Sequence, residues 1–134
     1  MLDSMNREEL ATLAEGWIRN QVAAKGSAES GGTWYAVQMA FDLADDDPET
    51  LWRLILAILS KDQSNKVLEN LSAGPMEDLL AKHGTLVITR VEQQAKADPA
   101  FASLLGGVWK NRMSGDIWDR VRKVWDRRGW DGSP

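Results

Sequence analysis

The tightest group of side chains with acid or base chemistry consists of Glu77, Asp78 and His83. His83 is the only histidine of the chain, and histidine is the side chain whose ordinary pKa lies near neutrality. A general acid and base must lie within hydrogen-bond reach, whereas Glu77 and His83 project from different faces of a short predicted helix. Negative charge is favourable at the start of a helix and positive charge at its end, so we interpret all three as helix-end charges. An enzyme or ligand-binding protein that uses them with Arg90 is the first alternative.

A second group of charged residues is the acidic run over residues 42–49. Carboxylates bind hard cations, but the run lacks the twelve-residue alternation and central glycine of an EF-hand. Its Asp47-Pro48 pair has the residue types preferred at the N-cap and first position of a helix. We therefore expect neither a metal nor a cofactor, and we interpret the run as a surface that attracts a basic partner. The carboxylates assigned to this surface are those of Asp42, Asp45, Asp46 and Glu49.

Apolar residues recur at helical spacing along the chain and predict helices without a convincing strand. The predicted ranges are 6–25, 33–45, 48–60, 64–72, 75–83, 85–96, 99–109 and 116–128. Gly74 and Gly84 are expected to end helices in the left-handed conformation, and residues 25–32 are expected to form a flexible loop. The predicted fold class is all-α, a compact irregular (orthogonal) bundle of seven or eight helices. The repeated Asp-Pro pairs at 47–48 and 98–99 leave a degenerate α-solenoid-like pair as an alternative.

Length and composition predict one globular domain over residues 1–134. Hydrophobic residues make up 43% and charged residues 27%, which is typical of folded proteins in water. The chain has no cysteine, which excludes a disulfide framework, a thiolate zinc site and a cysteine nucleophile. The first nine residues carry acids where a signal peptide has a basic region, and the apolar window 51–59 is too short to cross a bilayer. We expect a cytoplasmic protein that does not bind membranes.

The net charge of −4 is unevenly distributed. Residues 110–134 carry seven bases against four acids, a net charge of +3, and residues 1–109 carry nine bases against sixteen acids, a net charge of −7. Nucleic-acid binding depends on clustered Lys and Arg, so the acidic body argues against it. The bases at 120–128 alternate with acids at helical spacing, which indicates a solvated helix face. We predict no nucleic-acid partner.

The seven tryptophans divide into two groups. Five fall on apolar helical stripes and are predicted to lie in the core: Trp17, Trp52, Trp109, Trp118 and Trp125. Trp34 and Trp130 lie on no such stripe, and exposed aromatic residues often anchor protein interfaces. Gly106-Gly107 lacks the context of a phosphate-binding loop, so we attribute it to close helix packing.

Four sequence blocks carry a resemblance to a known family: the segment 46–49 with Trp52, the segment Ala73–Leu80 with His83-Gly84, Asp98-Pro99 with Phe101, and the segment Leu105–Trp109 with Asn111 and Trp118. Over about residues 42–130 the chain resembles a family of small helical bacterial proteins described as a domain of unknown function. That family has no established activity, so the resemblance transfers no functional residue. Members of such families often look like immunity proteins or antitoxins.

The sequence therefore predicts a protein that binds another protein and is not an enzyme. The most specific hypothesis is a bacterial immunity protein or antitoxin that blocks a basic toxin by occlusion, with Trp34 as an anchor beside the acidic surface. A homo-oligomeric scaffold subunit, such as a homodimer held by exposed tryptophans, is the second alternative.

Overall fold

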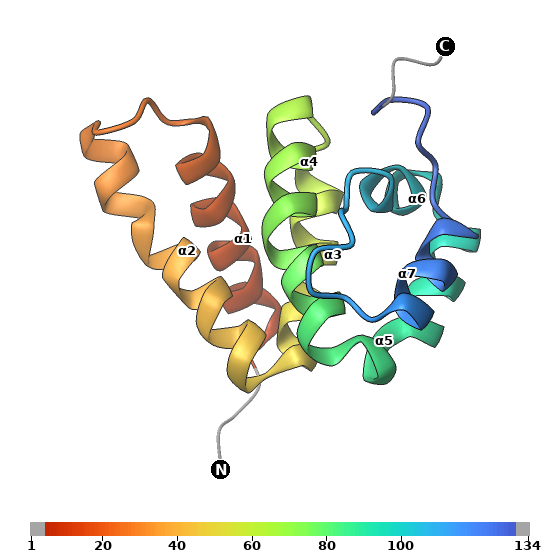
Figure 1. The fold of residues 1–134 in the computed structure, drawn as a ribbon. Coiled ribbons are helices and arrows are strands. Elements are labelled where there is room, and N and C mark those ends of the chain that lie inside the picture. Colours follow the sequence, from red (N-terminus) through yellow and green to blue (C-terminus); the bar gives the residue numbers. More distant parts are fainter. Residues whose placement is uncertain (1–4, 131–134) are drawn as a thin grey trace. The chain divides into compact units, whose positions relative to one another are not determined.

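The computed structural model describes residues 5–130 and builds them from helices (Figure 1). The chain divides into two compact units, one up to Val67 and one from Leu68 on, and each is described by itself below. The elements are α1 (Arg7–Val22), α2 (Ala28–Asp46), α3 (Pro48–Lys61), α4 (Asn65–Leu71), the π-helical segment η1 (Ser72–Met76), α5 (Glu77–Ala97), α6 (Pro99–Leu105) and α7 (Gly115–Arg122). No strand occurs in residues 5–130, so the all-α prediction is confirmed. The predicted domain over 1–134 spans both units, and residues 1–4, with part of the acidic N-terminus, and 131–134 lie outside the described residues.

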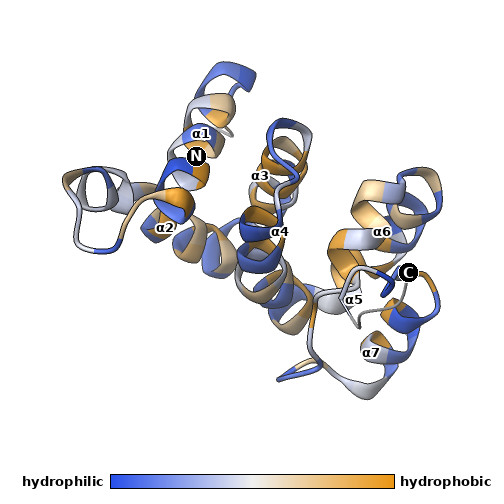
Figure 2. Ribbon diagram, turned by 90° about the horizontal axis from the view of Figure 1, so that it is seen from above, coloured by the Kyte–Doolittle hydropathy of each residue, from blue (hydrophilic) through white to orange (hydrophobic). Residues whose placement is uncertain are grey.

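The first unit consists of α1, α2 and α3, each of which packs against the other two. The Asn6 side chain accepts from the backbone N–H of Glu9 while the Glu9 carboxylate accepts from that of Asn6, so the two residues form a capping box at the start of α1. Asp47 accepts from the N–H of Thr50 and caps α3 ahead of Pro48, as its residue type predicts. Helix α3 carries most of the large buried residues of this unit, and Figure 2 shows the hydrophobic residues along it.

The prediction of a flexible loop over residues 25–32 is wrong for most of its length. Helix α2 begins at Ala28, because the Ser27 side chain accepts from the N–H of Ser30 and so caps the helix. Gly31 and Gly32 lie inside this helix although glycine has a low helix propensity. Only Gly26 within that range adopts a positive φ, of 76°. The strong N-cap therefore outweighs the helix-weakening glycines that follow it.

In the second unit, α5 contacts η1, α6 and α7. The predicted left-handed helix ends at Gly74 and Gly84 are wrong, since neither glycine has a positive φ. Gly74 lies in η1, and Gly84 lies inside α5, directly after a kink at His83 where φ is −134° and ψ is 28°. Gly84 is packed against Ile117 of α7, because a β-carbon built on it would lie 2.9 Å from Cγ1 of Ile117. Close packing explains this glycine better than a helix end does.

The Gly106-Gly107 pair also serves close packing, as predicted, but it packs mainly against the non-helical segment after α7 and not between two helices. A β-carbon on Gly106 would collide with the carbonyl oxygen of Asp126, and one on Gly107 would lie 2.5 Å from the ring of Trp130. The Trp130 indole donates from Nε1 to the carbonyl oxygen of Ser103 at 2.7 Å. These contacts hold the segment that follows α7 against the end of α6.

The five tryptophans predicted for the core have three different outcomes. Trp17 and Trp52 are buried, as predicted. Trp118 and Trp125 are half-buried and form an edge-to-face pair with ring centroids 5.2 Å apart. Trp109 is 72% exposed, so its prediction is wrong. The cause is the end of α6 at Leu105, four residues earlier than the apolar periodicity indicates.

The Gly107 packing gives a stability prediction. Gly107→Ala should lower the free energy of unfolding by about 1–3 kcal/mol, because the added methyl group overlaps the Trp130 ring and the Ser72 hydroxyl. Gly115→Ala is the matched control in the same unit, since nothing lies within 4 Å of its β-carbon position, and it should change stability little. Chemical denaturation monitored by circular dichroism measures both. Equal stability of the two variants would contradict the packing explanation.

Candidate protein-binding surface

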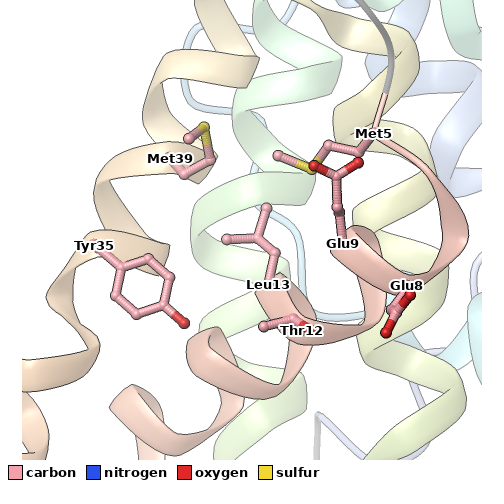
Figure 3. Close-up of a pocket in the computed structure, with 7 residues that line it drawn as sticks. All are labelled: Met5, Glu8, Glu9, Thr12, Leu13, Tyr35 and Met39. Carbon is pink, nitrogen blue, oxygen red and sulfur yellow. The ribbon is translucent and has the colours of Figure 1, made fainter.

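An open groove with a volume of about 330 Å³ lies between α1 and α2 (Figure 3). Tyr35 and Met39 of α2 form one side, and Leu13 of α1 with Met5 forms much of the other. Thr12 and the acidic side chains of the first turn of α1, Glu8 and Glu9, complete the lining. The groove therefore combines an apolar floor with carboxylates at one end.

Gly16 of α1 determines where the Tyr35 side chain lies. A β-carbon on Gly16 would be 2.5 Å from the hydroxyl oxygen of Tyr35 and 3.3 Å from Cβ of Ala36. Any larger residue would displace the phenol, because such contacts are shorter than van der Waals separations allow. The glycine thus lets α1 and α2 approach closely and lets the tyrosine lie across α1.

Helix α2 has an unusual distribution of side-chain sizes. Its buried residues are Thr33, Ala36, Ala40, Leu43 and Ala44, so only one of them is large. Its three aromatic residues, Trp34, Tyr35 and Phe41, are exposed, and Trp34 is 52% exposed. An amphipathic helix normally buries its large apolar residues. Exposed aromatic side chains often serve as anchors of protein interfaces.

The acidic residues predicted to attract a partner all lie on the surface of the same unit. Asp42, Asp45 and Asp46 are exposed near the end of α2, and Glu49 is exposed in the first turn of α3. Tyr35, Met39, Asp42 and Asp46 follow one another at helical spacing, so one stripe of α2 leads from the groove to two carboxylates. No ion pair or hydrogen bond joins Asp42 or Asp46 to another side chain within residues 5–130.

Sequence reasoning predicted that Trp34 and the acidic residues are exposed, but it missed the groove itself. Tyr35 and Met39 lie one stripe away from Trp34, and their role depends on a neighbouring helix. A signal is nevertheless present in the sequence: alanines at 36, 40 and 44 mark a small-residue face that must point inward. Large residues offset from that face must then point outward.

The alternative site at Glu77, Asp78 and His83 belongs to the second unit, and the structure changes its interpretation. Glu77 is only 7% exposed, and its carboxylate accepts from the backbone N–H of Trp109 at 3.1 Å and from Nδ2 of Asn111 at 3.5 Å. Its role is therefore to hold the loop that follows α6. The prediction that it neutralises a free helix start is wrong, because the preceding residue, Met76, is itself helical in η1.

His83 lies at the kink of α5, where two helical segments meet, and this agrees with the predicted helix end at residue 83 and the next start at residue 85. Asp78, His83 and Arg90 are half-buried on the same helix. Burial is the largest influence on Glu77 and raises the pKa of its carboxyl above 4.5, and the hydrogen bonds from Trp109 and Asn111 offset part of this rise. Within the described residues, no three His, Asp or Glu side chains are placed to hold a metal ion.

Among the basic residues after α6, Arg122 pairs with Asp119 within α7, whereas other arginines make contacts that helical spacing does not predict. Arg120 reaches across to α5 and donates to both carboxylate oxygens of Glu92, at 2.9 and 2.6 Å. This contact lowers the pKa of Glu92, mainly through the hydrogen bonds from Arg120. The guanidinium groups of Arg122 and Arg127 lie over the rings of Trp118 and Trp125, respectively.

Comparison with known proteins gives a family but no activity. The family model described as "Family of unknown function (DUF6869)" matches residues 23–129. This range contains the resemblance at 42–130 almost entirely and adds α2 to it. Neither a curated protein nor a solved structure matches the chain. No helix in residues 5–130 is long and apolar enough to cross a membrane.

The buried carboxylate gives a pH prediction. The pKa of Glu77 is raised in the folded state, so its contribution to stability is fully present below pH 4.5 and is lost as the pH rises through the folded-state value. Glu77→Gln removes this titration. As the pH rises from 4.5, the free energy of unfolding of wild type should therefore fall relative to that of the variant. Denaturation at several pH values measures this difference.

Glu77→Ala separates the hydrogen bonds from the titration. It leaves the N–H of Trp109 without its acceptor and should cost about 1–3 kcal/mol. If the free energies of unfolding of wild type and Glu77→Gln differ by the same amount at all pH values, the raised pKa of Glu77 is contradicted. Stability equal to wild type in Glu77→Ala would contradict the role of the carboxylate in holding the loop.

Proposed function

The chain belongs to the DUF6869 family of unknown function, and we propose that it is a protein-binding protein that receives a basic partner on the groove and the outer face of α2. One observation carries this proposal: α2 buries alanines and exposes Trp34, Tyr35 and Phe41 beside an apolar groove. Burying these exposed apolar side chains in a complex would stabilise that complex through the hydrophobic effect. Aromatic side chains of this kind are common anchors of interfaces.

Charge supports the choice of a basic partner. Glu8 and Glu9 lie at one end of the groove, and Asp42 and Asp46 continue its α2 side. Complementary charge around an apolar contact increases association rates and selects against partners of the wrong sign. A partner that presents an apolar or aromatic side chain flanked by Lys or Arg fits this surface.

The biological role that we propose is that of a bacterial immunity protein or antitoxin acting in the cytoplasm. In this role the acidic surface, with Trp34 and Asp42, Asp45, Asp46 and Glu49, covers a basic surface of the toxin and blocks it by occlusion. The support is the charge of the surface together with the resemblance of the chain to a family of unknown function, since members of such families often look like immunity proteins or antitoxins. Inhibition by occlusion needs only tight and specific binding.

A photocrosslinking experiment in the native host tests the location and the charge of the partner. A photoreactive amino acid at Tyr35 should crosslink a basic protein, and the same amino acid at the exposed Val22, which lies at the end of α1, should not. Asp42→Lys with Asp46→Lys should weaken binding of the purified partner at least tenfold, or about 1.4 kcal/mol, and remove most of its salt dependence.

Two outcomes of that experiment contradict the proposal. One is equal crosslinking from Tyr35 and Val22, and the other is undiminished binding by the double Lys variant. The antitoxin role requires in addition that the captured protein alone stops growth and that co-expression of this chain restores it. A partner without toxicity would retain the protein-binding function and refute the antitoxin role.

Trp34 gives a separate prediction. Trp34→Ala should leave the melting temperature nearly unchanged, because the indole is exposed and contributes little to the core. It should weaken binding of the captured partner by about 2 kcal/mol or more if Trp34 is an anchor of the interface. Isothermal titration calorimetry measures the affinity, and Val22→Ala is the matched control at an exposed apolar residue. Unchanged affinity would exclude Trp34 from the interface.

A further inference from the structure

Trp109 is the most exposed of the large hydrophobic side chains in residues 5–130. It lies on the loop between α6 and α7, which we call the Trp109 loop and define as residues 108–113. Exposing an indole forfeits the free energy of burying it, and tryptophan is usually at least partly buried. The exposure of Trp109 therefore needs an explanation.

The Trp109 loop is held in place at its two ends and under its backbone. Val108 and Met113 are buried at its two ends. The buried carboxylate of Glu77 accepts from the backbone of Trp109 and from the side chain of Asn111. Asn111 has a φ of 46°, in the left-handed region that non-glycine residues seldom occupy. A loop that is anchored at its ends and under its backbone presents the Trp109 side chain in a defined position.

Two cations follow the exposed indole on the Trp109 loop. Lys110 and Arg112 are exposed, and neither side chain forms an ion pair or hydrogen bond with another residue of the described chain. Other arginines of this unit are engaged, for example Arg120 with Glu92 and Arg128 with Asp126. The loop thus combines an exposed apolar group with two unpaired positive charges, and it fits a partner surface that combines apolar side chains with negative charge.

That opposite pattern occurs on the chain itself. The groove between α1 and α2 has an apolar floor, ends at Glu8 and Glu9, and continues along α2 to the unpaired carboxylates of Asp42 and Asp46. We propose that the Trp109 loop of one molecule docks into the α1–α2 groove of a second copy of the chain, with the indole on the apolar floor and Lys110 and Arg112 toward the carboxylates. Charge complementarity selects this occupant.

Such a contact joins two different surfaces, so it is heterologous and can extend from copy to copy. It also covers the surface assigned above to the basic partner. Self-association would then compete with partner binding and would regulate it, a consequence that rests on the proposed function. The docking contact itself does not depend on the identity or existence of that partner.

A charge-swap experiment on the full chain tests the docking contact. Wild type should self-associate in sedimentation equilibrium, and added salt should weaken the association. Asp42→Lys with Asp46→Lys, and separately Lys110→Asp with Arg112→Asp, should each lower the association constant at least tenfold, because each places like charges opposite one another. An equimolar mixture of the two variants should associate again, since loop and groove are complementary between them.

Trp109→Ala tests the apolar part of the contact, with Leu86→Ala as the control at an exposed apolar residue of the same unit. Only the first should lower the association constant, again by at least tenfold. Circular dichroism spectra identify variants that fail to fold. The two charge-swap variants need no further control for folding, because association in their mixture requires both of them to be folded.

Three results would overturn the inference: a monomeric wild type up to about 1 mM, no association in the mixed variants, or equal association by Trp109→Ala and Leu86→Ala. Binding of an oligothymidylate to a monomeric wild type through Trp109 would assign the loop to nucleic acid instead. A failure to capture any basic partner in the host would refute the proposed function and leave these measurements unaffected.

Discussion

Both units depend on one constraint: helices can approach their neighbours closely only where a glycine or an alanine lies at the contact. In the first unit Gly16 and Ala36 bring α1 and α2 together. In the second unit Gly84 accepts Ile117, and Gly107 accepts the ring of Trp130. Packed interiors tolerate even one added methyl group poorly, so these small residues fix the spacing of the helices.

The same constraint explains why the first unit has an apolar surface. A helix that packs through alanines must carry its large residues elsewhere, and α2 carries Trp34 and Phe41 on its outer face. Tyr35 is partly packed and partly exposed, because its phenol lies over Gly16 while much of the side chain faces the solvent. The groove beside it lies between α1 and α2, which approach closely through Gly16 and Ala36.

A buried carboxylate has a comparable role in the second unit. Burial of Glu77 is unfavourable for its charged form, and two hydrogen bonds from the loop after α6 compensate in part. The result is a loop with a fixed backbone and an exposed indole. In both units, polar or small residues inside determine which aromatic residues face the solvent.

Local signals in the sequence were sufficient for the helices and several of their starts. Asn6 with Glu9, and Asp47 with Pro48, cap their helices as their residue types indicate, because a cap involves only neighbours within one turn. The exposure of Trp34 and the acidic residues also followed from the sequence, since these residues fall outside the apolar stripes. The start of α2 at Ala28 was not predicted, because Gly31 and Gly32 disfavour a helix there. The Ser27 cap nevertheless starts the helix before them.

The tertiary structure alone decided the groove, the burial of Glu77 and the exposure of Trp109. Met5, Leu13, Tyr35 and Met39 form a groove only because α1 and α2 pack side by side. Glu77 and Trp109 are 32 positions apart, and no local pattern specifies that a carboxylate will accept from that backbone. Helix periodicity and capping depend on neighbours in the sequence, whereas these contacts depend on which surfaces the packing of whole helices brings together.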